Sequence, residues 1–246
     1  MITKKYYKVI RVSYEDQQYL TLTNTSETIG GFKVQKIGNP NPNLEYSLNG
    51  TDWTTYDLTN LPTIEIPVGG HIYLRGNNSN GFCSYVSNWC YFNMDVSHTA
   101  SGNMFSLINK DPETFSTYTT TKANGFKYLF WNDNYLTNVS GMIINMTSLN
   151  DSTFDSMFYN CRNLVDCLDL KNIVSVGTNS LSSLYKDCKK INTAIAPNIS
   201  TWGSTTGWLE GAGSEATGTK TVYAPTGLEI PTNNSGIPNG WTRVDY

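Results

Sequence analysis

The stretch FDSMFYNCRNL, residues 154–164, carries a short pattern that occurs three times in this chain. Apolar residues stand at its first position and at three, four, seven and ten residues beyond it. The copies begin at Phe126, Phe154 and Leu181, which are 28 and 27 residues apart, and only the first has a polar residue, Asp133, at position seven. A fixed period of about 20 to 50 residues is typical of stacked repeat units. The sequence therefore predicts a solenoid over this stretch.

The spacing within each copy predicts how one unit folds. Positions zero, three, four and seven fall on one face of an α-helix, because each residue advances about 100° around the helix axis. We therefore expect each unit to begin with a short helix and to continue, from position ten, as a loop or short strand. One unit cannot bury its apolar face alone, so the units are expected to stack.

The stretch 154–164 resembles the MFxxCxxL unit of the BspA-like leucine-rich repeats, which occur in surface proteins of gut bacteria and of the phages that infect them. Segments 44–53, 72–78, 100–107 and 236–242 are similar to sequences that flank such repeats, so the resemblance covers roughly residues 15–245. The chain departs from the family pattern at Asp133, where Cys is usual, and at Tyr185, where Phe is usual. The resemblance implies a repeat fold and a surface protein, and implies no chemistry.

Short runs of β-forming residues, separated by turn residues, precede the repeats and are typical of a sandwich. The runs are 19–24, 32–37, 44–48, 53–58, 64–67, 72–75 and 90–96. Residues 4–14 are predicted to form a further strand, either at a sheet edge or as an attachment arm.

Asn49-Gly50 predicts a hairpin with a two-residue type I′ turn. In that register Tyr46 faces Trp53, and the core side chains of the hairpin are expected to be Leu44, Tyr46, Leu48 and Trp53. The alternative for Trp53 is a sugar-stacking platform.

The predicted fold class is therefore α+β. An antiparallel β-sandwich is expected at residues 1–97, with residues 1–14 as its arm, followed by BspA-like repeats at 98–218. Residues 219–246 are expected to form an irregular C-terminal cap in which Trp241 seals the open end of the stack.

Composition excludes several classes of partner. Charged residues make up 15% of the 246 residues and the net charge is -3, so no basic field attracts nucleic acid or an anionic membrane. No run approaches the roughly 18 apolar residues that a membrane span needs. The N-terminal segment also lacks the apolar run of a secretory signal. This favours a virion protein, which is released by lysis, over a secreted adhesin.

The residue types that carry chemistry are sparse. The two histidines, His71 and His98, belong to no catalytic motif, and the glycines of 211–218 lack the pattern of a phosphate loop. The five cysteines form no CxxC pair, and Cys161 and Cys188 share one repeat position, which indicates packing and not metal or disulfide use. The carboxylates Glu45, Asp52 and Asp57 are expected to be solvated hairpin charges. We predict no catalytic, cofactor or metal site, and no enzyme.

The candidate partner-binding residues are Trp131, Tyr159 and Lys186, at position five of each copy, and Tyr135 at position nine of the first. On a helix these positions lie opposite the buried face. They are expected to bind a partner, to contact the sandwich or a second subunit, or to have no role.

The expected function is that of a non-enzymatic phage virion protein, displayed on the capsid or tail as a decoration, head-fibre or tail-fibre component. Its partners would be other virion proteins and a host-surface glycan or protein, and it could be a homo-oligomer, a trimer if it forms a fibre. The alternatives are a bacterial cell-surface adhesin and, in another class, a glycan-processing enzyme or a glycan-binding module that uses exposed aromatic residues.

Overall fold

Strands and turns make up most of the residues that this computed structural model describes, which are 18–83 and 87–246. Strands account for 28% and helices for 6%, and the helices are three short 3-10 segments. The predicted α+β class with a solenoid of helical repeat units is therefore wrong. The sheets are small, mixed and open, and the fold is all-β in character. The strand predicted at residues 4–14 lies outside the described residues.

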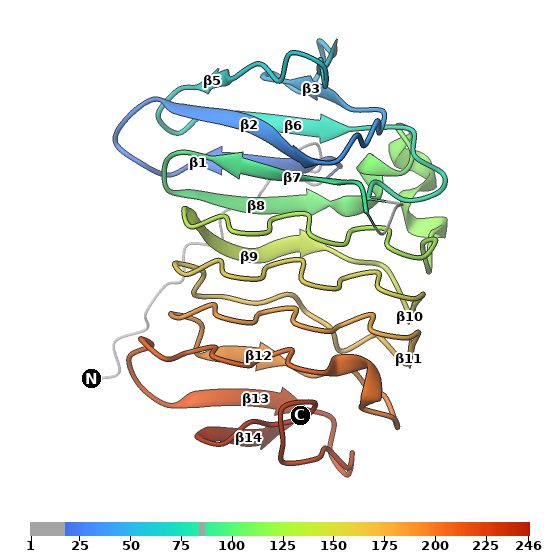
Figure 1. Ribbon diagram of the computed structural model, residues 1–246, viewed down its shortest axis with the longest axis vertical. Helices are drawn as coiled ribbons and strands as arrows, with labels where there is room; N and C mark the ends of the chain where they lie inside the picture. Colours follow the sequence, from blue (N-terminus) through green and yellow to red (C-terminus); the bar gives the residue numbers. More distant parts are fainter. Residues whose placement is uncertain (1–17, 84–86) are drawn as a thin grey trace, which may run out of the picture.

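The described residues up to Asn103 build most of two sheets that share one core (Figure 1). A six-stranded sheet has the order β4-β3-β6-β1-β8-β9, and a three-stranded sheet has the order β5-β2-β7. Each of the seven predicted runs overlaps one of the strands β1 to β7, and β8 and β9 complete the larger sheet. The strands are β1 (Leu20–Asn24), β2 (Gly30–Ile37), β3 (Glu45–Ser47), β4 (Thr54–Thr55), β5 (Ile64–Ile66), β6 (His71–Arg75), β7 (Trp89–Met94), β8 (His98–Asn103) and β9 (Leu136–Ile143).

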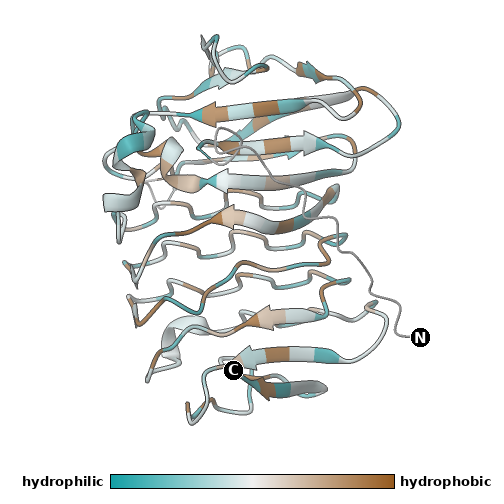
Figure 2. Ribbon diagram, turned by 180° about the vertical axis from the view of Figure 1, so that it is seen from behind, coloured by the Kyte–Doolittle hydropathy of each residue, from teal (hydrophilic) through white to brown (hydrophobic). Residues whose placement is uncertain are grey.

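Alternation places the apolar side chains of these strands inside. Ile72 and Leu74 of β6 are fully buried, whereas their neighbours along the strand are exposed or half-buried, as a period of two residues requires. Figure 2 shows hydrophobic and hydrophilic colours alternating along the upper strands. Tyr56 joins the two sheets, because its hydroxyl accepts the Val34 amide of β2 at 3.0 Å and its ring lies edge-on to Phe32.

The hairpin of β3 and β4 differs from the prediction by one residue in register. Glu45 lies opposite Thr55. A type I′ turn needs positive φ at both central residues, and Gly50 has it, at 79°, whereas Asn49 does not. The side-chain oxygens of Ser47 and Asn49 accept backbone amides of the loop, which makes the turn wider than two residues.

The register shift moves Trp53 to the outer face of the sheet, because a slip of one residue exchanges the two faces of a strand. There its ring lies under the Arg75 guanidinium, at 3.9 Å. Leu48 is 49% exposed, so it is not core either. Leu44 is buried and Tyr46 packs partly against the core, as predicted.

The six-stranded sheet continues across residue 97 into the repeats. β8 pairs antiparallel with β1 and parallel with β9. The chain between β8 and β9 includes the 3-10 helices η2 (Met104–Leu107) and η3 (Pro112–Thr117). The three-stranded sheet also joins the repeats, because the Phe92 amide of β7 donates to the Leu129 carbonyl at 2.8 Å.

The segments predicted to be helices are instead layers of consecutive turns. We call residues 124–133, 152–161, 179–188 and 205–212 turn layers one to four. In layer one the amides of residues 124, 126, 128, 130 and 132 donate to carbonyls of residues 151–159 in and beside layer two, while the amides of 127, 129, 131 and 133 donate to the carbonyl three residues back. Layer two binds layer three in the same way, and layer three binds layer four.

A left-handed residue every fourth position explains why no α-helix forms. The residues at 124, 128, 132, 152, 156, 160, 179, 183 and 187 have φ between 53° and 62°. All except Tyr128 are Asn, Ser or Asp, whose short polar side chains bond locally and suit turns and left-handed backbone. Each such residue interrupts a right-handed helix, and, except at Asn179, its own amide donates to a carbonyl in or beside the next layer.

The inner side chains of the layers stack on one another. The rings of Phe130, Phe158 and Tyr185 lie 5.6 Å apart between successive centroids and are nearly parallel. The thiols of Cys161 and Cys188, at position seven, donate to the Phe130 and Phe158 carbonyls at 3.0 and 2.9 Å. Residues at the same position of successive repeats therefore stack on one another.

Short parallel strands complete the lower half of the stack (Figure 1). Trp241, predicted to seal the open end, is buried at the start of the last strand, and the Trp208 indole of layer four donates to the Gly236 carbonyl at 2.6 Å. The remaining elements are β10 (Ser148–Leu149), β11 (Ser175–Val176), β12 (Thr193–Ile195), η4 (Gly203–Thr205), β13 (Lys220–Ala224) and β14 (Trp241–Asp245).

Candidate binding surface

Three of the four predicted partner-binding residues form one column on the outer side of the turn layers. Trp131, Tyr159 and Lys186 occupy the same position in layers one, two and three. The amide that follows Trp131 donates to the Tyr159 carbonyl, and the amide that follows Tyr159 donates to the Lys186 carbonyl. All three residues are half-buried. Tyr135 is 46% exposed just beyond layer one, and no contact found among the described residues connects its side chain with the column.

The column continues upward as an aromatic strip, which we define as Trp89, Tyr91, Tyr128, Trp131 and Tyr159. Ring centroids are 4.6 Å apart for Trp89 and Tyr128, 6.3 Å for Tyr128 and Trp131, and 5.4 Å for Tyr91 and Trp131. The first two residues come from β7 and the others from the turn layers. The strip therefore spans the place where the three-stranded sheet meets the repeats.

Charges beside the strip are paired. Lys127 Nζ lies 2.7 Å from Asp155 Oδ2 and 4.9 Å from the Tyr128 ring. Burial alone would lower the pKa of Lys127, but the hydrogen bond and charge of Asp155 outweigh it, so the pKa is raised and the ammonium stays charged. Lys186 pairs with Glu210 at 3.1 Å. The strip thus presents aromatic rings whose flanking charges cancel locally.

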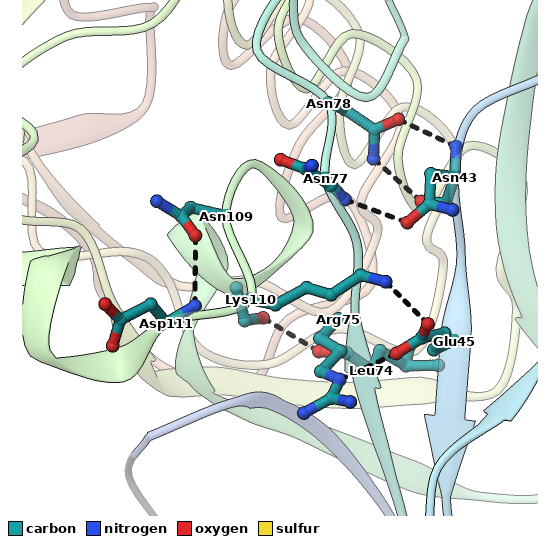
Figure 3. A network of polar contacts seen from close by, with 10 residues as sticks. Asn43, Glu45, Leu74, Arg75, Asn77, Asn78, Asn109, Lys110 and Asp111 are labelled. Carbon is teal, nitrogen blue, oxygen red and sulfur yellow. Dashed lines mark hydrogen bonds and ion pairs between the residues drawn. The ribbon is translucent and has the colours of Figure 1, made fainter.

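A second cluster lies on the outer face of the six-stranded sheet (Figure 3). Glu45 binds Arg75 at 2.8 Å and Lys110 at 2.5 Å, and Trp53 covers the Arg75 guanidinium. Burial would raise the pKa of Glu45, but its two cationic partners hold the pKa below the ordinary value. The expectation of a solvated Glu45 was wrong, because this carboxylate ties β3, β6 and the η2–η3 connection together.

The closest approach to a catalytic pair is buried. His98 Nε2 lies 3.1 Å from Asp133 Oδ2, and both side chains have no exposed surface. The His98 Nδ1 atom donates to the Val96 carbonyl at 2.9 Å. Burial lowers the pKa of His98, but the charge of Asp133 and these contacts outweigh it, so the pKa is raised above its ordinary value. A substrate cannot reach this pair, which joins β8 to layer one.

Sequence reasoning missed the upper half of the strip. Tyr91 belongs to the predicted run 90–96 and Trp89 directly precedes that run, and nothing local indicates that their outer side meets the repeats. Tyr128 was missed although position two lies about 200° from position zero and faces outward even on a helix. In the turn layers it is a left-handed residue beside Trp131. The alternation of Trp89, Tyr91 and Asn93 along β7 was the one available signal.

Among residues 18–83 and 87–246, no group of three or more His, Cys, Asp or Glu residues is placed to hold a metal ion, and no helix there has the length and apolarity to span a bilayer. No family model, no curated protein and no solved structure matches this chain.

Proposed function

We propose that this chain is a non-enzymatic attachment protein, carried on the surface of a bacteriophage particle, that contacts its partner through the aromatic strip. The observation that carries the proposal is the strip itself, in which the rings of Trp89, Tyr91, Tyr128 and Trp131 from two regions lie close together and Tyr159 occupies the position of Trp131 in the next layer. Aromatic residues dominate the energetics of protein interfaces, because they bury large areas with little loss of side-chain freedom. Their flanking charges are already paired, which suits an uncharged partner surface.

The virion assignment is supported by the sequence resemblance to BspA-like surface proteins of gut bacteria and their phages. A bacterial cell-surface adhesin is the second candidate, because the same resemblance includes such proteins. The strip would contact either another protein of the particle, which would hold the chain in place, or a molecule of the host surface, which would attach the particle to the cell.

The test is the double substitution Trp131→Ala with Tyr159→Ala, made in the intact chain. Both side chains are half-buried at the surface, so the variant is expected to fold. We expect weaker incorporation into phage particles or weaker attachment of particles to host cells, measured by quantifying the protein in purified particles and by adsorption assays. Tyr223→Ala on β13 is the control, since Tyr223 is 39% exposed and lies outside the strip.

Normal incorporation and normal adsorption of the folded double variant would remove the strip from consideration. Recovery of the native protein in the bacterial envelope fraction, and not in particles, would favour the adhesin.

A further inference from the structure

A cleft lined by amides opens on the connections above the strip. It has a volume of about 500 Å³ and lies between residues 39–42, which follow β2, and residues 77–82 and 88, which lie between β6 and β7. Six of its lining residues are asparagines, and none carries an ionisable side chain; they are Asn39, Asn41, Asn77, Asn78, Asn80 and Asn88.

The walls of the cleft are held by other hydrogen bonds. Asn78 Oδ1 accepts the Asn43 amide at 2.8 Å, and Asn78 Nδ2 donates to the Asn43 carbonyl at 2.8 Å (Figure 3). The same Nδ2 also donates to the Leu107 carbonyl at 2.6 Å. Asn88 Oδ1 accepts the Asn39 amide at 3.1 Å. The walls also approach closely, since a Cβ at Gly76 would lie 2.2 Å from the Asn43 carbonyl oxygen. The cleft is therefore preformed.

Four amides remain free for a ligand. The side chains of Asn39, Asn41, Asn77 and Asn80 are exposed and make no hydrogen bond in the part of the chain that the structure describes. Asparagines are common in loops because their side chains form hydrogen bonds with the nearby backbone, yet these four side chains form no such bond with the described backbone. Each offers two donors and an acceptor. Together they give the cleft hydrogen-bond donors and acceptors that no described residue uses.

This chemistry fits one class of ligand. A nucleic acid needs cationic side chains and a calcium ion needs carboxylates, and the cleft offers neither. A peptide anchor needs an apolar pocket, but Phe82 at the base of the cleft is 2% exposed. Adjacent hydroxyl groups of a sugar match the donor and acceptor of a primary amide. We infer that the cleft binds a neutral oligosaccharide, a site separate from the aromatic strip and independent of the function proposed for it.

The test is binding of the intact chain to a glycan array and then titration calorimetry. The array would hold neutral oligomers of glucose, galactose, mannose and N-acetylglucosamine, together with carboxylated and sulfated counterparts. We expect binding to a neutral oligomer and no preference for the charged forms. Asn77→Ala with Asn80→Ala should weaken that binding by at least about tenfold, because two ligand hydrogen bonds are lost.

The matched control is Asn198→Ala with Asn239→Ala, two exposed asparagines far from the cleft whose side chains have no hydrogen bond among the described residues. This control should bind like the native protein, and Asn41→Ala tests the opposite wall on its own. The inference is overturned if no neutral oligomer binds, if the Asn77 and Asn80 variant binds normally, or if Trp131→Ala with Tyr159→Ala abolishes binding while the cleft variants do not.

Discussion

The two sheets and the turn layers bury apolar side chains with different backbones. In the sheets, successive side chains alternate between core and solvent, and Gly102 of β8 is the one described strand residue with a positive φ. In the layers, every fourth residue is left-handed, and alternate amides leave the layer to bind the next one. The first device depends on register between neighbouring strands, whereas the second depends on residue type at fixed positions. The two regions should therefore respond differently to the same kind of substitution.

The largest expected effect is that of a charge in the interior of the layers. Met157 is fully buried in layer two. Met157→Asp would leave an unpartnered carboxylate there, at a cost of about 5 kcal/mol in the free energy of unfolding, which approaches the total stability of many domains. Met157→Leu keeps the volume and should cost less than about 1.5 kcal/mol. Urea unfolding measures both, and a soluble Asp variant with native stability would contradict the layer structure.

The next effect concerns the joint between the regions. Asp133→Ala should lower the free energy of unfolding by about 3 to 5 kcal/mol, because it leaves His98 buried without its anion. It also removes the acceptor for the Tyr135 and Leu136 amides. Urea unfolding at pH 6 provides the measurement, and a loss below about 1 kcal/mol would mean that the pair is not charged.

The same pair predicts a pH dependence with a defined sign. The folded pKa of His98 is raised, so its protonated form is stabilised by folding. The contribution is fully present below the unfolded histidine pKa of about 6.5 and is lost as the pH rises through the folded pKa. The unfolding free energy of the native protein should therefore fall as the pH rises above about 6.5, and in Asp133→Ala this fall should disappear. An unchanged profile in the variant would assign the fall to another group.

A smaller effect tests the left-handed positions. Ser183 has φ of 53°, where a β-branched side chain is strained, so Ser183→Val should cost about 1 to 2 kcal/mol. Ser183→Gly should be close to neutral. The controls are Ser182→Val in the same layer and Thr99→Val in β8, neither of which has positive φ, and both should stay within about 0.5 kcal/mol. Equal costs at residues 182 and 183 would mean that the backbone is not what distinguishes the regions.

The smallest effect concerns the thiols, which serve both regions alike. All five cysteines are free and buried, and Cys83 donates to the Cys90 carbonyl just as Cys161 donates to that of Phe130. Burial raises the pKa of Cys161 well above its ordinary range and that of Cys167 to about 12. Alkylation of the native protein should be slow, five thiols should react after denaturation, and reductant should leave the melting temperature unchanged. A bridge between Cys161 and Cys188 in mass mapping would contradict this.

The strands were predictable because alternation over four to eight residues has one simple structural solution. The turn layers were not, because apolar residues at zero, three, four and seven fit a period of 3.6 and a period of 4 equally well over two turns. The distinguishing signal was present in the polar residues. Asn, Ser or Asp recurs every four positions at 152, 156 and 160 and again at 179, 183 and 187, which a helix does not require.

The candidate sites were predictable in part. Trp131 and Tyr159 could be placed outward from sequence because their positions lie between inward ones under either period. Trp53 was placed on the wrong face, because side-chain capping of the loop by Ser47 and Asn49 overrode the Asn-Gly turn. The amide cleft could not be foreseen, since its two walls are about 35 residues apart in sequence and meet only through bonds such as that between Asn43 and Asn78.

The pairing of Asp133 with His98 determines which turn layer lies beside β8. Repeated units can assemble one unit out of step, because each presents nearly the same surface to its neighbours. Layers two and three carry Cys161 and Cys188 where layer one carries Asp133. If layer two took the place of layer one beside β8, His98 would face a thiol and Asp133 would lose its cation. Such a shifted arrangement is disfavoured by the penalty for an unpaired buried charge. A single departure from the repeat thus identifies which unit must meet the sheet.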